Sequence, residues 1–231
     1  MRLRGLIADF PFCMDILTND YKEEIIMFGN WKINPVVGGM PQKIATAFAK
    51  LSETLIGAEY EPIAYLGEQT VNGVNHAVLA KQILTTGRDT ENIVVIIFNE
   101  RPDAMEATLV SIERVVEGGM ALGGVKIFDG DSIPEDAKAA FKTTFTNYVG
   151  AKYEPIALLG TQVVNGINYI FAATLEPVVQ NPEKQAVIVV VNDAAGSVAI
   201  EDLMKTKHES ALGYSFTWLK GGFGKPLGEW P

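Results

Sequence analysis

The sequence predicts an α+β protein of two tandem domains, each with one helix packed on a four-stranded antiparallel sheet. Three observations lead to this prediction: the chain repeats itself, each copy has one amphipathic helical pattern, and each copy then has four strand patterns. The strand patterns are joined by short connections, and a parallel pair would need a long crossover. The economical packing is therefore an antiparallel sheet curled around a single helix.

The repeat is the main feature of the chain. Residues 57–75 and 150–168 match at fourteen of nineteen positions, with a constant offset of 93. The match extends without gaps and pairs Phe48 with Phe141. A period of this length is too long for a solenoid unit and suits a small domain. We therefore expect a leader at 1–26, repeat 1 at 27–115, repeat 2 at 120–205 and a tail at 206–231.

The joint between the repeats, Glu117–Gly124, is rich in glycine. Glycine-rich linkers behave as flexible coils. We therefore expect the joint to let the two domains reorient.

The leader at 1–26 does not resemble a secretory signal, because Asp9 and Asp15 interrupt its apolar stretch. Lys22–Glu24 can be encoded by a purine-rich bacterial ribosome-binding sequence, and Met27 follows at a suitable spacing. The compartment is left open, with the cytoplasm favoured. Our hypothesis is that the protein is bacterial and that its translation begins at Met27. Detection of peptides from 1–26 by mass spectrometry of the natively expressed protein would rule it out.

One helix is expected in each repeat, before the strands. In repeat 1 Pro41 stands near the start and Gly57 just past the end, as is common at helix termini. In repeat 2 Ser132–Glu135 has capping-box spacing and Gly150 provides the stop. The apolar faces at helical spacing are Ile44, Ala47, Phe48, Leu51 and Leu55 in repeat 1, and Ala137, Phe141, Phe145 and Tyr148 in repeat 2.

Four strands are expected after each helix, from β-branched and apolar runs bounded by turn residues. The expected strands are 60–69, 74–80, 93–98 and 108–112 in repeat 1, and 153–162, 167–173, 186–191 and 198–203 in repeat 2.

Composition excludes several classes of function. The net charge is −9 and the basic residues are not clustered, which argues against nucleic acid as a partner. No apolar run approaches the roughly 20 residues that span a bilayer, so no membrane partner is expected. Cys13 is the single cysteine, and His76 and His208 are the two histidines. The sequence therefore predicts no catalytic residues, no metal site and no cofactor.

Each repeat contains the same five-residue motif between its first two expected strands, Gln69–Gly73 and Gln162–Gly166. Asn-Gly between two strands predicts a tight hairpin of type I′, in which both turn residues have positive φ. The turn does not explain why Gln, or the valine two residues later (Val71 and Val164), occupies the same place in both copies. Apolar side chains at an exposed tip suggest a contact surface.

These motifs resemble the Gln-x-Val-x-Gly signature of the cystatins, especially the disulfide-free stefin type. Gly166–Tyr169 is similar to the residues that often follow that signature, and Val36–Gly39 resembles the N-terminal glycine segment of inhibitory cystatins. The resemblance implies a non-catalytic module that inhibits papain-like cysteine proteases with an apolar wedge. The binding residues it implies are Gln69, Thr70, Val71, Asn72, Gly73, Gln162, Val163, Val164, Asn165 and Gly166 in the loops, and Gly38 and Gly39 at the N-terminal contact.

Two other functions stay open. The motif asparagines, Asn72 and Asn165, stand where the family has a small residue, and neither Glu100–Asp103 nor Asp193–Gly196 carries the Pro-Trp pair of the second inhibitory hairpin. A structural or adhesive repeat protein without inhibitory activity is therefore the alternative. An enzyme on a related cone-shaped fold is disfavoured, because the repeated positions hold no nucleophile beside a base. The sequence leaves the target protease and the oligomeric state undetermined.

Overall fold

The computed structural model describes residues 31–85, 90–104, 106–119, 122–194 and 198–202. Within these residues the protein is a mixed α/β chain that is mostly sheet. The expectations for the leader, Cys13, the start at Met27 and the tail at 206–231 lie outside the described part.

Both repeats have the same order of elements, namely a strand, a helix and four further strands. In repeat 1 these are β1 (Trp31–Val37), α1 (Gln42–Glu53), β2 (Ala58–Val71), β3 (Gly73–Leu84), β4 (Glu91–Glu100) and β5 (Thr108–Glu117). In repeat 2 they are β6 (Val125–Ile127), α2 (Glu135–Phe145), β7 (Ala151–Val164), β8 (Gly166–Pro177), β9 (Gln185–Asn192) and β10 (Val198–Asp202).

The prediction of four-stranded sheets is wrong, because each repeat forms a five-stranded sheet. Sheet A has the order β1-β2-β3-β4-β5 and sheet B the order β10-β9-β8-β7-β6, and all the strand pairs are antiparallel. The extra strand in each sheet is the one that precedes the helix.

The strands before the helices escaped prediction because their sequence signals are weak. β1 is interrupted by Pro35, and its pairing with β2 shifts register between Ile33 and Val36. An edge strand tolerates such a proline because one side of it needs no hydrogen-bond partner. β6 has only three residues, which is too short for an alternating pattern to be recognised.

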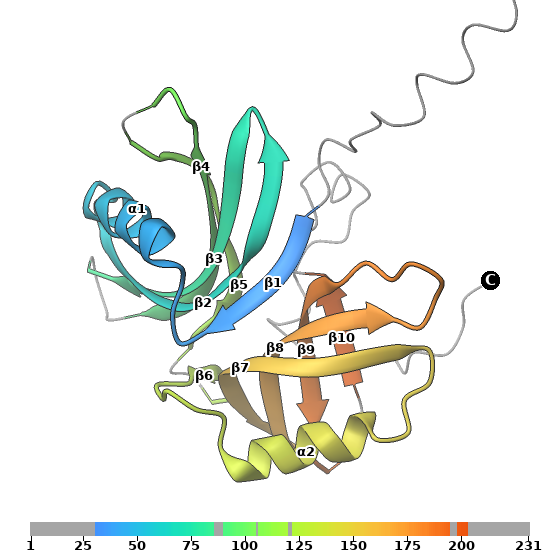
Figure 1. The fold of residues 1–231 in the computed structure, drawn as a ribbon. Helices are drawn as coiled ribbons and strands as arrows, with labels where there is room; N and C mark the ends of the chain where they lie inside the picture. The colour runs from blue at the N-terminus through green and yellow to red at the C-terminus, as the bar shows by residue number, and fades with distance from the viewer. Residues whose placement is uncertain (1–30, 86–89, 105, 120–121, 195–197, 203–231) are drawn as a thin grey trace, which may run out of the picture.

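The two sheets pack face to face, and the helices lie on the outer faces, α1 on sheet A and α2 on sheet B (Figure 1). Fully buried side chains of both repeats, Leu66 and Leu79 from sheet A and Leu159 and Ile170 from sheet B, belong to one shared core. A shared core holds the repeats in one arrangement, so the expectation that the joint lets them reorient is wrong.

Strand alternation explains how each sheet serves two cores. Along β3, Ala77 and Leu79 face sheet B, whereas Val78 and Ala80 face α1. Both faces are apolar, which is why the central strands read as continuous apolar runs.

The helices bury most of the predicted faces and begin without side-chain caps. The prediction is wrong for Leu55 and Tyr148, which lie past the ends of α1 and α2, and Tyr148 is exposed. Ile44, Phe48 and Leu51 of α1 are buried, as are Ala137 and Phe141 of α2. The capping box predicted at Ser132–Glu135 does not form, because Pro134 is the N-cap and makes no side-chain cap bond.

Candidate functional site

The two motifs form the tips of the β2–β3 and β7–β8 hairpins, as predicted, but the turn type differs. Val71 pairs with Gly73 and Thr70 with Val74, so the loop beyond the Thr70–Val74 pair has three residues, with Asn72 at its apex. Gly73 has φ +98°, whereas Asn72 is not among the described non-glycine residues with positive φ. The predicted type I′ turn is therefore wrong. Three-residue hairpin loops place a glycine in this conformation at their last position.

The motif glutamines belong to a ladder of side-chain amides that crosses each sheet just behind the tip. In repeat 1 Asn75 Nδ2 donates to Gln69 Oε1 at 2.8 Å, and Asn99 Nδ2 donates to Asn75 Oδ1 at 2.8 Å. The ladder links three neighbouring strands, because Gln69 pairs with Asn75 and Asn75 with Asn99.

The same ladder recurs in repeat 2 at the offset of 93 residues. Asn168 Nδ2 donates to Gln162 Oε1 at 3.0 Å, and Asn192 Nδ2 donates to Asn168 Oδ1 at 2.9 Å. Asn168 is fully buried. Buried polar groups must be hydrogen-bonded to offset their loss of water, so this ladder explains the repeated glutamine.

The motif glycines are required by the neighbouring hairpin. A Cβ on Gly73 would lie 2.5 Å from the carbonyl oxygen of Glu100, and a Cβ on Gly166 would lie 2.6 Å from Cβ of Ala194. The connection after β4, or after β9, therefore lies directly against the motif tip. The first and second hairpins of each repeat are therefore neighbours.

The tips differ in how much apolar surface they expose. In repeat 1 Thr70 and Asn72 are exposed while Val71 is half-buried. In repeat 2 the exposed fractions of Val163 and Val164 are 73% and 39%. The open apolar tip is therefore the one in repeat 2.

A segment of the joint completes the tip of repeat 2. Gln162 Nε2 donates to the carbonyl oxygen of Gly123 at 2.7 Å, and Val125 pairs with Gln162. Leu122, next to Gly123, is fully exposed. Leu122, Val163 and Val164 are named here the repeat 2 tip. The sequence did not single out Leu122, although the glycines that follow it gave a signal.

The structure does not bring Gly38 and Gly39 to the motif hairpin. The amide of Gly38 donates to the carbonyl oxygen of Ile63 at 3.2 Å. Val71 lies eight positions along β2 from Ile63, which is about 26 Å at ~3.3 Å per residue. The expected N-terminal contact at these glycines therefore lies away from the tip of repeat 1.

The two tips lie at different places on the molecule. β5 ends with Glu117 paired to Asn92, at the end of sheet A remote from Asn72. The chain then enters β6, where Val125 pairs with Gln162, two residues before Val164. The tip of repeat 2 therefore lies near the end of sheet A that is remote from Asn72, and the two tips do not form one surface.

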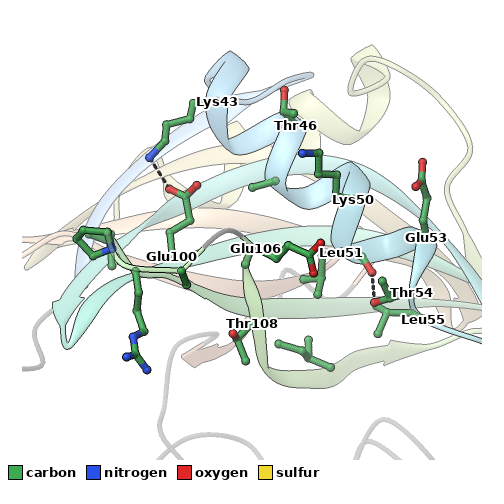
Figure 2. A pocket seen from close by; sticks show the side chains of 17 residues that line it. Lys43, Thr46, Lys50, Leu51, Glu53, Thr54, Leu55, Glu100, Glu106 and Thr108 are labelled. Atoms are coloured by element: carbon green, nitrogen blue, oxygen red, sulfur yellow. Dashed lines mark hydrogen bonds and ion pairs between the residues drawn. The ribbon is translucent and has the colours of Figure 1, made fainter.

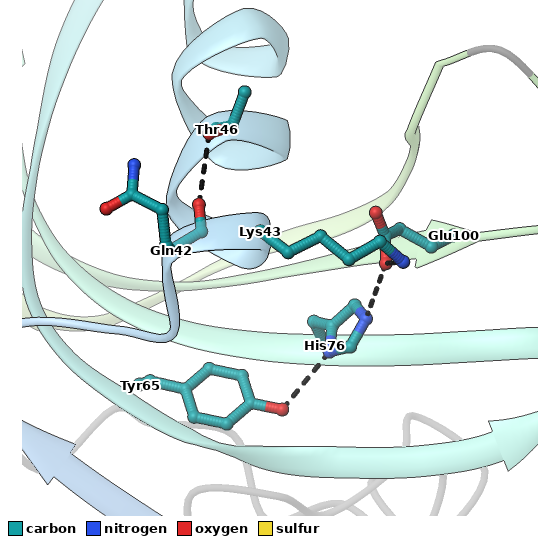
Figure 3. A network of polar contacts seen from close by, with 6 residues as sticks. All are labelled: Gln42, Lys43, Thr46, Tyr65, His76 and Glu100. Carbon is teal, nitrogen blue, oxygen red and sulfur yellow. Dashed lines mark hydrogen bonds and ion pairs between the residues drawn. The ribbon is translucent and has the colours of Figure 1, made fainter.

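Repeat 1 also contains a buried polar network that the sequence did not predict (Figure 3). Tyr65 Oη and His76 Nδ1 are 3.1 Å apart, and His76 Nε2 lies 3.4 Å from Glu100 Oε2. Glu100 also pairs with Lys43, at 2.9 Å. Side chains alternate along β3, so His76 lies on the same face as Val78 and Ala80, under α1. This alternation is the sequence signal from which a buried histidine could have been predicted.

Burial controls the protonation of this network. It lowers the pKa of His76, against the opposing effect of Glu100, so the imidazole is neutral near pH 7. It also raises the pKa of Tyr65 to about 12, together with the charges of Glu68 and Glu100. His76 is only 4% exposed, so the network presents Glu100 and Lys43 to solvent and keeps the imidazole covered.

Glu100 and Lys43 stand at one end of an open groove between α1 and the β4–β5 connection (Figure 2). The groove has a volume of about 1310 Å³. Leu51 and Leu109 are among its apolar lining residues, while Lys50 and Glu106 add opposite charges. This mixture selects neither a cationic nor an anionic ligand.

Comparisons with known proteins give no family for the chain. No protein-family model matches it, and a search of curated proteins finds no significant match. Among the described residues, no cluster of His, Cys, Asp and Glu is arranged to hold a metal ion. None of the helices in that part of the chain is long and apolar enough to cross a membrane.

Proposed function

We propose that this chain is a non-catalytic binding protein of the cysteine-protease-inhibitor type, which acts through the repeat 2 tip. The observation that carries the proposal is the set of exposed apolar side chains at that tip, Leu122, Val163 and Val164. The resemblance of the motif to the cystatin signature supports a papain-like cysteine protease as the partner.

The energetics favour such a contact. Full burial of a valine or leucine side chain against a partner contributes roughly 1.5–3 kcal/mol. The amide ladder from Gln162 through Asn168 to Asn192 fixes the hairpin before binding. A tip that is ordered in advance loses little conformational entropy on docking.

The tip of repeat 1 is a poorer contact. Val71 is half-buried there, and Arg101 and Asp103, which form a salt bridge at 3.0 Å, are both exposed beside the tip. Charged groups are costly to bury in an apolar cleft. The proposal therefore assigns binding to one tip and a stoichiometry of one protease per chain.

The test is the residual activity of papain in the presence of the full chain. We expect inhibition by the wild-type protein, loss of inhibition with Val164→Asp, and little change with Val110→Asp, a control on β5 where the valine is 54% exposed. Equal effects of the two substitutions would contradict the assignment to the repeat 2 tip.

A structural or adhesive repeat protein is the second candidate function. The observation that favours it is that Gln and Gly of the motif have structural roles in both repeats, in the ladder and beneath the neighbouring hairpin. A repeat protein that needed only this fold, without inhibitory activity, would also retain the glutamine and the glycine. Absence of inhibition at a large molar excess of the chain over papain would favour this candidate.

A further inference from the structure

An apolar patch lies at the end of repeat 2 that is opposite to its motif tip. Its exposed members are Tyr148, Val149, Val178 and Val179, with exposed fractions of 48%, 93%, 75% and 62%. They come from the α2–β7 and β8–β9 connections, which lie at the same end of sheet B (Figure 1). The amide of Val178 donates to the carbonyl oxygen of Gly150 at 2.8 Å, which fixes the two connections side by side. We name these four residues the repeat 2 base.

Aromatic rings support the base from below. Phe145 stacks on Tyr153 with ring centroids 4.4 Å apart, and Tyr148 contacts both rings at 5.4 Å. At the offset of 93 residues, repeat 1 has Leu55 for Tyr148 and an exposed Ile56 for Val149, but Thr85 for Val178 and Ser52 for Phe145. The α2–β7 half of the base is therefore apolar in both repeats, whereas Val178 and the supporting ring of Phe145 are particular to repeat 2.

The path of the chain leads the C-terminal segment toward the repeat 2 base. β10 runs antiparallel to β9, and its last residue, Asp202, pairs with Val187, two residues from the β8–β9 connection. The chain therefore leaves sheet B at the end where the base lies. The residues that follow it are rich in glycine and aromatic side chains, namely Tyr214, Phe216, Trp218, Phe223 and Trp230.

We propose that residues 211–231 dock on the repeat 2 base and cover it. The preceding residues, 203–210, can span the short distance from Asp202 to the base, because an extended chain covers about 3.3 Å per residue. Aromatic side chains bury large areas, and the glycines let the segment follow the surface closely. An intramolecular segment is favoured over a second copy by its high effective concentration.

The first experiment measures the binding of a hydrophobic fluorescent dye to the full chain. We expect low dye fluorescence for the wild type and at least a threefold rise for the double variant Phe216→Ala/Trp218→Ala, which uncovers the base. Addition of Val149→Asp and Val178→Asp to that variant should abolish the rise, because the dye then lacks its apolar site. Addition of Val110→Asp, the exposed valine of β5, should leave the rise unchanged.

A second measurement reads the tail directly. In a Trp31→Phe background the remaining tryptophans are Trp218 and Trp230, and we expect their emission to shift to longer wavelength when Val149→Asp and Val178→Asp are introduced. Emission that already equals that of the urea-unfolded chain, or that ignores the substitutions, would overturn the proposal. So would a dimeric mass in light scattering that becomes monomeric with these substitutions, because a second copy would then cover the base.

Discussion

The side-chain amide of Asn168 donates to Gln162 Oε1 at 3.0 Å, and this bond joins the motif of repeat 2 to the buried centre of the sheet. The same relationship joins Asn75 to Gln69 in repeat 1. A glutamine that the sequence marks as a contact residue thus holds the hairpin in place. In the proposed function, binding is left to the side chains that project beyond it.

Replacement of Asn168 by alanine should destabilise the protein. It removes the bond to Gln162 Oε1 and the bond from Asn192, and it leaves a space where a fully buried side chain stood. We expect a loss of about 1–3 kcal/mol in the free energy of unfolding, measured by urea denaturation. Asn165→Ala at the exposed tip is the control and should change stability little; equal losses would contradict the role of the ladder.

Alanine at the motif glycines should also be costly. Gly73 and Gly166 have φ +98° and +89°, and a Cβ at either would meet the adjacent hairpin. Each substitution should lower the free energy of unfolding by more than about 1 kcal/mol. Gly39→Ala is the matched control, because its Cβ would meet no atom within 4 Å. A neutral Gly73→Ala would show that the tip can relax.

The shared core predicts that the two repeats unfold together. Leu79→Ala removes a fully buried side chain between the sheets and should cost about 2–5 kcal/mol. Hydrogen exchange of the β3 and β8 amides should accelerate to the same extent. Acceleration confined to repeat 1 would show that the repeats are independent.

The buried histidine predicts a dependence of stability on pH. In the folded protein the pKa of His76 is lowered from its ordinary value of 6.5, chiefly by burial. At a pH below 6.5 the unfolded chain therefore binds a proton at His76 more readily than the folded protein does. The contribution of the neutral imidazole is present above that pH and is lost as the pH falls below it. Urea denaturation between pH 7.5 and about 5 should therefore show a steeper fall for the wild type than for His76→Tyr.

Tyrosine is the natural replacement, because repeat 2 has Tyr169 at the equivalent position. There Tyr169 Oη donates to Asp136 Oδ2 at 3.2 Å. The comparison of wild type and variant cancels the titration of the carboxylates that both share. Parallel pH profiles would contradict a buried, neutral His76.

The sequence predicted the features that depend on local pattern. The helix faces around Phe48 and Phe141 and the hairpins at both motifs follow from spacing and turn residues, and the structure contains them. β1 and β6 were missed because Pro35 and a length of three residues obscure alternation.

The features that were missed depend on contacts between distant residues. The shared core could not be read from the sequence, because an inward face looks the same whether it meets a helix or a second sheet. The type of turn at Asn72 depends on the hairpin beside it. The network of Tyr65, His76 and Glu100 joins three strands. The position of Leu122 at the repeat 2 tip depends on the bond between Gly123 and Gln162.

The most direct test of the proposed function is the inhibition constant of the full chain against papain, with Val164→Asp and Val71→Asp compared side by side. Val164 is exposed at the repeat 2 tip and Val71 is half-buried in repeat 1. We expect Val164→Asp to raise the constant at least tenfold and Val71→Asp to raise it less than threefold, with both variants folded. A wild-type chain that leaves papain fully active, or a Val164→Asp variant that inhibits as well as the wild type, would contradict the account.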